Sequence, residues 1–119
     1  MTYLVDANVL SEPTKPAPSR KVIDWLSANE RNLVVDSIVL GELYKWFDAL
    51  MQTIECLPWD ATISRRWAKL VVDLKRKGAT MPLLDGMIAA TALQHGLTIA
   101  TRNTRDFKKA GLKVFNPFA

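Results

Sequence analysis

The chain has 119 residues, of which 49% are hydrophobic and 24% charged, a composition typical of one globular domain and unlike that of disordered or fibrous chains. A single cysteine and a single histidine exclude an internal disulfide and offer no Cys/His zinc spacing. Sixteen basic residues against twelve acidic ones give a net charge of +4, which favours polyanionic partners such as nucleic acid.

The N-terminal sequence MTYLVD has no basic region and reaches an acid after two apolar residues, so it does not read as a secretory signal. No apolar run approaches the roughly 18 residues of a transmembrane helix. We therefore expect a cytoplasmic protein with no membrane segment. We also expect Cys56 to be a buried, inert thiol, because no histidine or basic residue neighbours it in sequence.

Short apolar runs alternate with longer segments of helical periodicity. Strands are expected at residues 3–5, 33–35, near 55–57, 98–100 and 113–115, and helices at residues 19–26, 39–51, 60–77 and 83–95. Asp60 is placed to cap one helix, and Gly78 and Gly96 to end two of them. The alternation predicts one layered α/β domain over residues 1–119.

Four acids fall where this outline places the carboxyl ends of strands or the first turns of the following helices: Asp6, Glu42, Asp85 and Asp106. Ligands bind at that edge of a doubly wound parallel sheet, so the four acids are expected to converge. A cluster of carboxylates raises its members' pKa values unless a cation neutralises it, and oxygen ligands suit Mg²⁺ or Mn²⁺. An acid in a first helical turn also stabilises the helix dipole, which alone explains Glu42 or Asp85 taken singly.

Four blocks in order resemble the motifs of the PIN-domain ribonucleases, particularly the VapC-type toxins of toxin–antitoxin modules. They are residues 3–11 (YLVDANVLS), 40–43 (LGEL), 82–92 (PLLDGMIAATA) and 101–107 (TRNTRDF). The resemblance implies a mostly parallel sheet flanked by helices in three layers and a metal-dependent endoribonuclease. It assigns catalysis and Mg²⁺ or Mn²⁺ binding to Asp6, Glu42, Asp85 and Asp106.

Three neighbouring polar residues are expected to orient these ligands or a water: Asn8, Thr101 and Asn103. Asn103 stands where many PIN domains carry an acid, and either Asn103 or Asp106 supplies the fourth oxygen. A neutral Asn103 weakens the attraction for a second cation, so we expect one tightly bound metal and a second bound weakly or only with RNA.

The segment 43–58 is shorter than in PIN-domain relatives, which generally have a helical hairpin there. The resemblance implies a cognate antitoxin as partner and a homodimer, but the altered segment leaves a monomer as the alternative.

Basic residues flank the fourth block at Arg102, Arg105, Lys108 and Lys109, where they are expected to contact RNA phosphates. A second basic group, residues 75–77, ends a predicted helix, where stabilisation of the helix dipole explains it equally well.

Two other functions compete with this interpretation. A phosphotransferase of the haloacid dehalogenase type normally needs a second aspartate where this chain has Asn8. A catalytically silent module that binds RNA or sequesters an antitoxin is the second alternative. The lone His95 lies at a predicted helix end, which disfavours a histidine-based ribonuclease.

Overall fold

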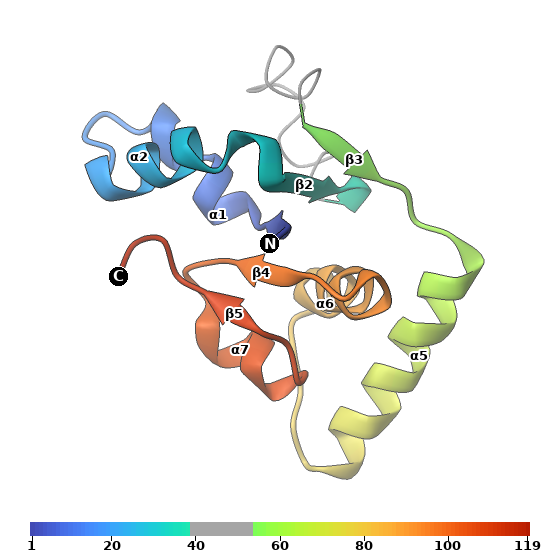
Figure 1. Ribbon diagram of the computed structural model, residues 1–119. Coiled ribbons are helices and arrows are strands. Elements are labelled where there is room, and N and C mark those ends of the chain that lie inside the picture. The colour runs from blue at the N-terminus through green and yellow to red at the C-terminus, as the bar shows by residue number, and fades with distance from the viewer. Residues whose placement is uncertain (39–53) are drawn as a thin grey trace.

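In the computed structural model of the chain, the described residues are 1–38 and 54–119. Five strands form one sheet in this part of the chain: β1 (Tyr3–Val5), β2 (Leu33–Asp36), β3 (Glu55–Leu57), β4 (Thr98–Ala100) and β5 (Val114–Phe115) (Figure 1). The strands expected from the sequence are therefore confirmed to within a residue. The expected helix 39–51 and Glu42 lie outside the described residues.

All four strand pairings are parallel, in the order β3-β2-β1-β4-β5. From β1 the chain moves to one side of the sheet through β2 and β3, and then crosses to β4 and β5 on the other. The strand order therefore reverses between β1 and β4, and such a reversal places a crevice beyond their carboxyl ends.

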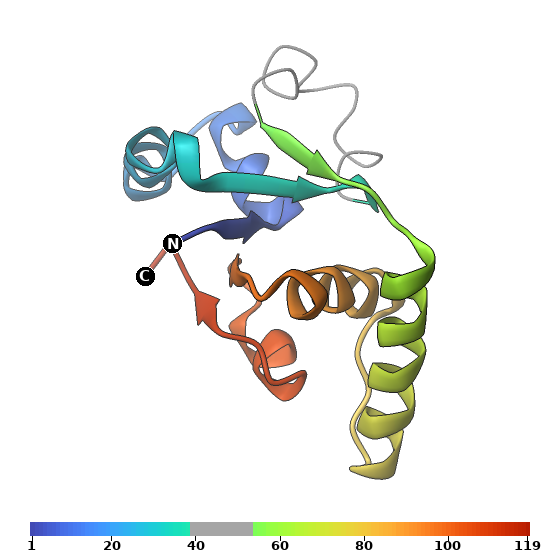
Figure 2. The same cartoon turned by 45° about the vertical axis from the view of Figure 1, so that its right-hand side comes forward.

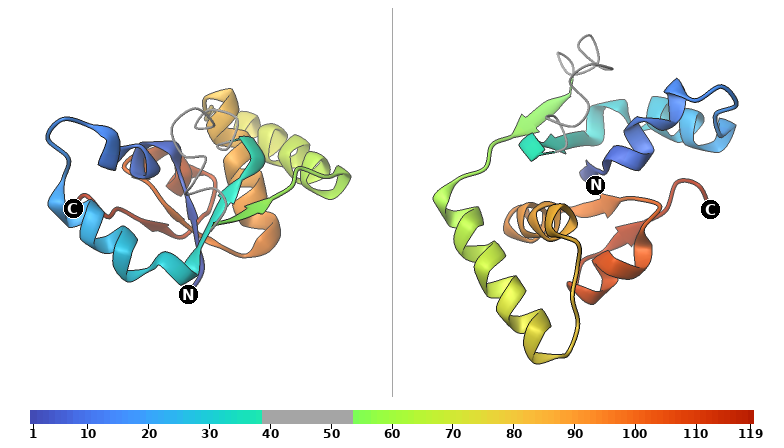
Figure 3. Two further views of the ribbon diagram at one scale, coloured as in Figure 1. Left: turned by 90° about the horizontal axis from the view of Figure 1, so that it is seen from above. Right: turned by 180° about the vertical axis from the view of Figure 1, so that it is seen from behind.

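Helices cover both faces of the sheet, as Figure 3 shows from above. Right-handed crossovers place the helices before β2 on one face and those after β3 on the other. The first group is α1 (Ala7–Leu10), η1 (Glu12–Thr14), α2 (Arg20–Ala28) and η2 (Glu30–Asn32), and the second is α5 (Ala61–Arg76), α6 (Leu83–His95) and α7 (Thr104–Lys109). The expected α/β fold with a parallel sheet flanked by helices is confirmed. The short helices α1 and α7 were not predicted.

The two long helices begin and end where their sequences indicate. The side chain of Asp60 accepts a hydrogen bond from the Ile63 N–H at 2.8 Å at the start of α5, and Gly96 ends α6 in a left-handed conformation with φ of 64°. α6 has no polar stripe: Ile88, Ala89 and Ala92 belong to the hydrophobic core. Its small residues let the helix pack closely on the sheet.

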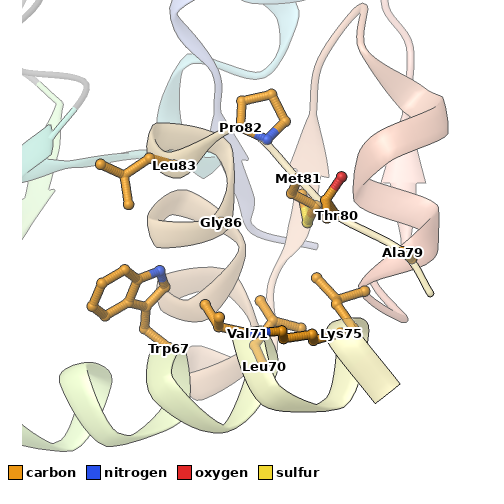
Figure 4. A pocket seen from close by; sticks show the side chains of 11 residues that line it. Trp67, Leu70, Val71, Lys75, Ala79, Thr80, Met81, Pro82, Leu83 and Gly86 are labelled. Carbon is orange, nitrogen blue, oxygen red and sulfur yellow. The ribbon is translucent and has the colours of Figure 1, made fainter. Parts of the chain in front are cut away.

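An apolar groove of about 320 Å³ lies between α5 and the segment that leads into α6 (Figure 4). Trp67 and Leu70 line it from α5, and Met81, Pro82 and Leu83 line it from the other side. The Trp67 indole would contact a methyl group added at Gly86 at 3.6 Å, an ordinary van der Waals distance. In the described residues, no helix is long and apolar enough to cross a membrane.

The carboxylate of Asp36, at the end of β2, is buried with 1% of the residue exposed. Its Oδ1 accepts a hydrogen bond from the Ile38 N–H at 2.6 Å, but its Oδ2 has no hydrogen-bond partner among residues 1–38 and 54–119. The nearby Thr91 hydroxyl donates to the Met87 carbonyl oxygen instead, at 3.4 Å. Burial raises the pKa of Asp36, and neighbouring polar groups, among them Thr91 and the Ile38 N–H, offset part of that effect.

Cys56 is exposed, which shows that the expectation of a buried thiol was wrong. It lies on β3, which pairs with β2 on one side only and forms an edge of the described sheet. An edge strand has less protein around it than a central one, so its side chains are covered less completely.

Substitutions at two glycines of α6 are expected to have opposite effects. Gly86→Ala should stabilise the protein by up to about 1 kcal/mol, because alanine favours the helix and its methyl group fits against Trp67. Gly96→Ala should destabilise it by about 1 kcal/mol, because φ is 64° there. Urea denaturation measures both changes. A loss of stability in Gly86→Ala comparable to that in Gly96→Ala would contradict the described packing.

Asp36→Asn should raise the melting temperature at pH 7 by about 3 °C or more, because it removes a buried charge that is incompletely paired within the described part of the chain. The native pKa of Asp36 is raised, so ionisation destabilises the fold as pH rises from the unfolded value of 3.8 through the native pKa. The gain should therefore shrink as pH falls towards 3.8. Asp24→Asn, at an exposed carboxylate, should change the melting temperature little at either pH. A pH-independent gain would show that charge is not the cause.

Candidate metal centre

Asp6 lies directly after β1, at the edge of the sheet where the strand order reverses. Its backbone N–H donates to the Ala100 carbonyl oxygen at 3.0 Å, which fixes the turn out of β1 against the end of β4. Its Oδ1 accepts from the Ala7 N–H at 2.7 Å and so caps α1. Asp6 is held by its own backbone and by the helix that it starts, and only 6% of the residue is exposed.

Thr101 is fully buried directly after β4, and its hydroxyl connects three polar residues of the site. The hydroxyl donates to Asp6 Oδ2 at 2.8 Å and accepts from the Asn103 N–H at 3.0 Å. It also accepts from Asn8 Nδ2 at 3.2 Å. A hydroxyl has one hydrogen and two lone pairs, so these contacts use its full hydrogen-bonding capacity.

Asn8 also connects the end of β1 with the end of β4. Its Oδ1 accepts from the Arg102 N–H at 3.1 Å, and its Nδ2 lies 3.4 Å from Asp6 Oδ2. The side chain therefore ties the first turn after β1 to the first residues after β4. This position agrees with the expected orienting role of Asn8, and the role itself stays a prediction.

Asn103 joins the two remaining described acids. Its Nδ2 donates to Asp85 Oδ2 at 3.0 Å and to Asp106 Oδ2 at 3.1 Å. Asp85 lies in the first turn of α6 and Asp106 in the first turn of α7. One amide group, with two hydrogens, thus holds together carboxylates that are 21 positions apart in the sequence.

The site therefore consists of two hydrogen-bonded groups that share Thr101. One contains Asp6 and Asn8, and the other contains Asp85 and Asp106 around Asn103. Within residues 1–38 and 54–119, no three histidine, cysteine or acidic side chains lie close enough together to hold a metal ion. Glu42, the remaining expected ligand, lies outside the described residues.

Burial raises the pKa of Asp6, and the hydrogen bonds from Thr101 and Ala7 offset part of that effect. An ionised, buried carboxylate is stabilised by a cation placed against it. The donors available here are carboxylate and amide oxygens, the ligands that Mg²⁺ and Mn²⁺ prefer. The donor atoms present are therefore of the kind that a hard divalent cation prefers, although the described acids alone do not form a group of three ligands.

The four expected RNA-binding cations lie beside this site, on or next to α7. Lys109 Nζ lies 3.6 Å from Asp106 Oδ1, so this lysine neutralises an acid of the site. The guanidinium of Arg102 lies over the Phe118 ring, 3.7 Å from its centroid. Arg105 and Lys108 are exposed on α7. Contact with RNA stays a prediction for all four.

The polar connections were only partly visible in the sequence. Thr101 and Asn103 were expected to support the acids, but that one amide bridges Asp85 and Asp106 could not be read from their spacing. The signal available was that two polar residues, 101 and 103, follow a buried strand and precede an acid.

The model of the PIN domain family matches residues 47–113 of this chain. The chain is 34% identical to a VapC ribonuclease, Y4jK of Sinorhizobium fredii, over 135 aligned positions that cover 97% of this chain and 96% of the relative. The 135 aligned positions outnumber the 119 residues of this chain, so this chain has gaps in the alignment with its relative. The expected shortening at 43–58 falls largely outside the described residues and stays a prediction.

Solved structures show the same fold. The structure of FitAcB from Neisseria gonorrhoeae matches with a TM-score of 0.91 and 31% identity, covering 98% of this chain and 99% of that one. A toxin–antitoxin complex from Klebsiella pneumoniae matches with a TM-score of 0.77 and 26% identity, covering 98% of both chains. On the family model, the identity to its relatives and the shared fold, the chain belongs to the PIN domain family.

Proposed function

We propose that this chain is a divalent-metal-dependent endoribonuclease and the toxin of a toxin–antitoxin pair. The observation that carries the proposal is the hydrogen-bonded network that brings Asp6, Asp85 and Asp106 to one edge of a PIN-domain sheet. The relative named a VapC ribonuclease, similar over nearly its whole length, supports the same reaction.

Asp6 and Asp85 would hold the cation, with Asp106 and Glu42 completing the site. A Mg²⁺ or Mn²⁺ held there would supply activation of a water and would offset the charge of the scissile phosphate. Thr101 keeps the Asp6 carboxylate in place through the 2.8 Å hydrogen bond, and Asn103 keeps Asp85 and Asp106 together. A network that fixes its carboxylates before binding lowers the cost of ordering them around a cation.

Two features of the surroundings favour an RNA substrate and an antitoxin partner. Exposed Arg105 and Lys108 stand on the helix that carries Asp106, where they can contact phosphates without reading the base sequence. A structure with this fold is a toxin–antitoxin complex, which supports an antitoxin protein as partner. The site of action for such a pair would be the cytoplasm.

The proposal predicts metal-dependent cleavage of RNA. Purified wild type should cut total cellular RNA into discrete fragments with Mg²⁺ or Mn²⁺, and excess EDTA should abolish cleavage. Asp85→Asn should reduce the rate by about a hundredfold or more, because it removes a carboxylate expected to bind the cation. Gel electrophoresis of the products measures the effect.

Asp24→Asn is the matched control, because Asp24 is an exposed aspartate that pairs with Arg20 on α2. It should cleave like wild type. Intact RNA with folded wild type and metal present would contradict the proposal and favour the catalytically silent module. Equal cleavage by Asp85→Asn would show that another site is responsible.

The neutral Asn103 between two acids predicts one tight Mn²⁺ site in the free protein. Asn103→Asp should create a second tight site and lower the metal-free melting temperature, because three carboxylates then meet without the bridging amide. Calorimetric titration with Mn²⁺ gives the stoichiometry, and Asn32→Asp at an exposed position controls for the added charge. Two tight sites in wild type would contradict this assignment.

A further inference from the structure

The net positive charge of the chain is concentrated on one helix. Residues 61–77, which comprise α5 and the residue after it, contain six basic residues and one acid. The rest of the chain contains ten basic residues and eleven acids, and is therefore close to neutral. α5 therefore carries most of the chain's net positive charge.

The basic residues of α5 face away from the core. Ile63, Leu70 and Leu74 are its buried residues. At 100° per residue, Arg65, Lys69 and Arg76 lie on the opposite side of the helix, and all three are exposed. We call these three residues the α5 ridge.

The position of α5 leaves this ridge open. Figure 2 shows α6 crossing α5 near its first turns, so that the remainder of α5 projects beyond α6 at the edge of the molecule. Val72, on the same side of the helix as the ridge, has 47% of its surface exposed. The ridge is therefore accessible along its length in the described part of the chain.

Among the described residues, the cations of α5 form none of the ion pairs that are found on other elements. Lys15, Arg20 and Lys109 each lie within 4.0 Å of an acid one helical turn away. In the described residues no such ion pair involves a cation of α5; Arg66 makes a long hydrogen bond to the Gln94 side chain, at 3.5 Å. Their charge is thus not neutralised within the described structure.

Helix stability does not account for the ridge. The helix dipole favours Lys75 and Arg76 in the last turn of α5, but it gives no such benefit to Arg65 and Lys69 in the first half. Arg65 and Lys69 are also four residues apart, a spacing at which like charges destabilise a helix, and Asp73, four residues after Lys69, offsets this effect for Lys69 but not for Arg65. A binding role explains what local stability does not.

We infer that the α5 ridge binds the phosphate backbone of RNA, as a contact surface additional to the cations beside the metal centre. The inference rests on the proposed ribonuclease function for the choice of RNA as the polyanion. From Arg65 to Arg76 the helix rises about 16 Å, a length over which its cations can contact several phosphates of one RNA strand. The α5 ridge contacts phosphates and not bases, so it gives no base specificity.

The test compares RNA binding by two triple variants with the same change in net charge. Arg65→Gln/Lys69→Gln/Arg76→Gln removes the ridge, and Lys21→Gln/Arg31→Gln/Lys113→Gln removes three exposed cations elsewhere. Fluorescence anisotropy with a labelled 20-nucleotide unstructured RNA in EDTA gives the dissociation constant at several salt concentrations. Melting temperatures confirm that both variants fold.

Loss of the ridge should weaken binding about tenfold or more at low salt and reduce the slope of log K against log salt by about two, since each phosphate contact contributes about 0.7. The control variant should change the slope by less than one. Arg65→Lys/Lys69→Arg/Arg76→Lys should bind like wild type, because it keeps the charges.

An unchanged dissociation constant and salt slope in the ridge variant would overturn the inference. If the ridge variant binds RNA like wild type but no longer binds poly-L-glutamate, the ridge would instead be assigned to binding an acidic protein. The outcome is independent of the proposed reaction, because binding is measured without metal. Weakened binding by the ridge variant with no RNA cleavage by wild type would support the ridge and refute the ribonuclease.

Discussion

The hydrogen bond from the Thr101 hydroxyl to Asp6 Oδ2, 2.8 Å long, connects the fold to the candidate site. Asp6 ends β1 and Thr101 follows β4, so the bond closes the edge of the sheet where the strand order reverses. The same hydroxyl accepts the Asn103 N–H and thereby positions the amide that contacts Asp85 and Asp106. The parallel pairing of β1 with β4 thus brings Asp6 next to Thr101, and through Thr101 and Asn103 this acid is linked to the other two.

A hydrogen-bonded network links three acids, and within residues 1–38 and 54–119 the cation Lys109 forms an ion pair with one of them. Asp85 and Asp106 share the Asn103 amide group, and Lys109 lies 3.6 Å from Asp106. The hydrogen-bond donors that Asp6 receives from the described residues are neutral. Burial makes the ionised form of Asp6 less favourable, and a divalent cation would reverse that effect. The abundant basic residues lie instead on α5 and around α7, where they are exposed and suited to a polyanion.

The sequence predicted the elements well where local signals agreed. The helix expected at 83–95 was found with those bounds because an apolar run, a preceding proline and a terminal glycine coincide there. The sequence could not reveal that Asn103 bridges two acids, because that contact depends on the positions of side chains from three different elements. Nor could it show that Cys56 is exposed, since the edge position of β3 follows from the strand order.

The central claim is that the hydrogen-bonded acids form a site for one divalent cation. Anomalous diffraction from crystals of the protein soaked in Mn²⁺ tests it most directly. The account predicts one strong peak within bonding distance of the carboxylates of Asp6 and Asp85, at the carboxyl edge of the sheet. The absence of a peak there, or a peak bound only by acids elsewhere on the surface, would contradict it.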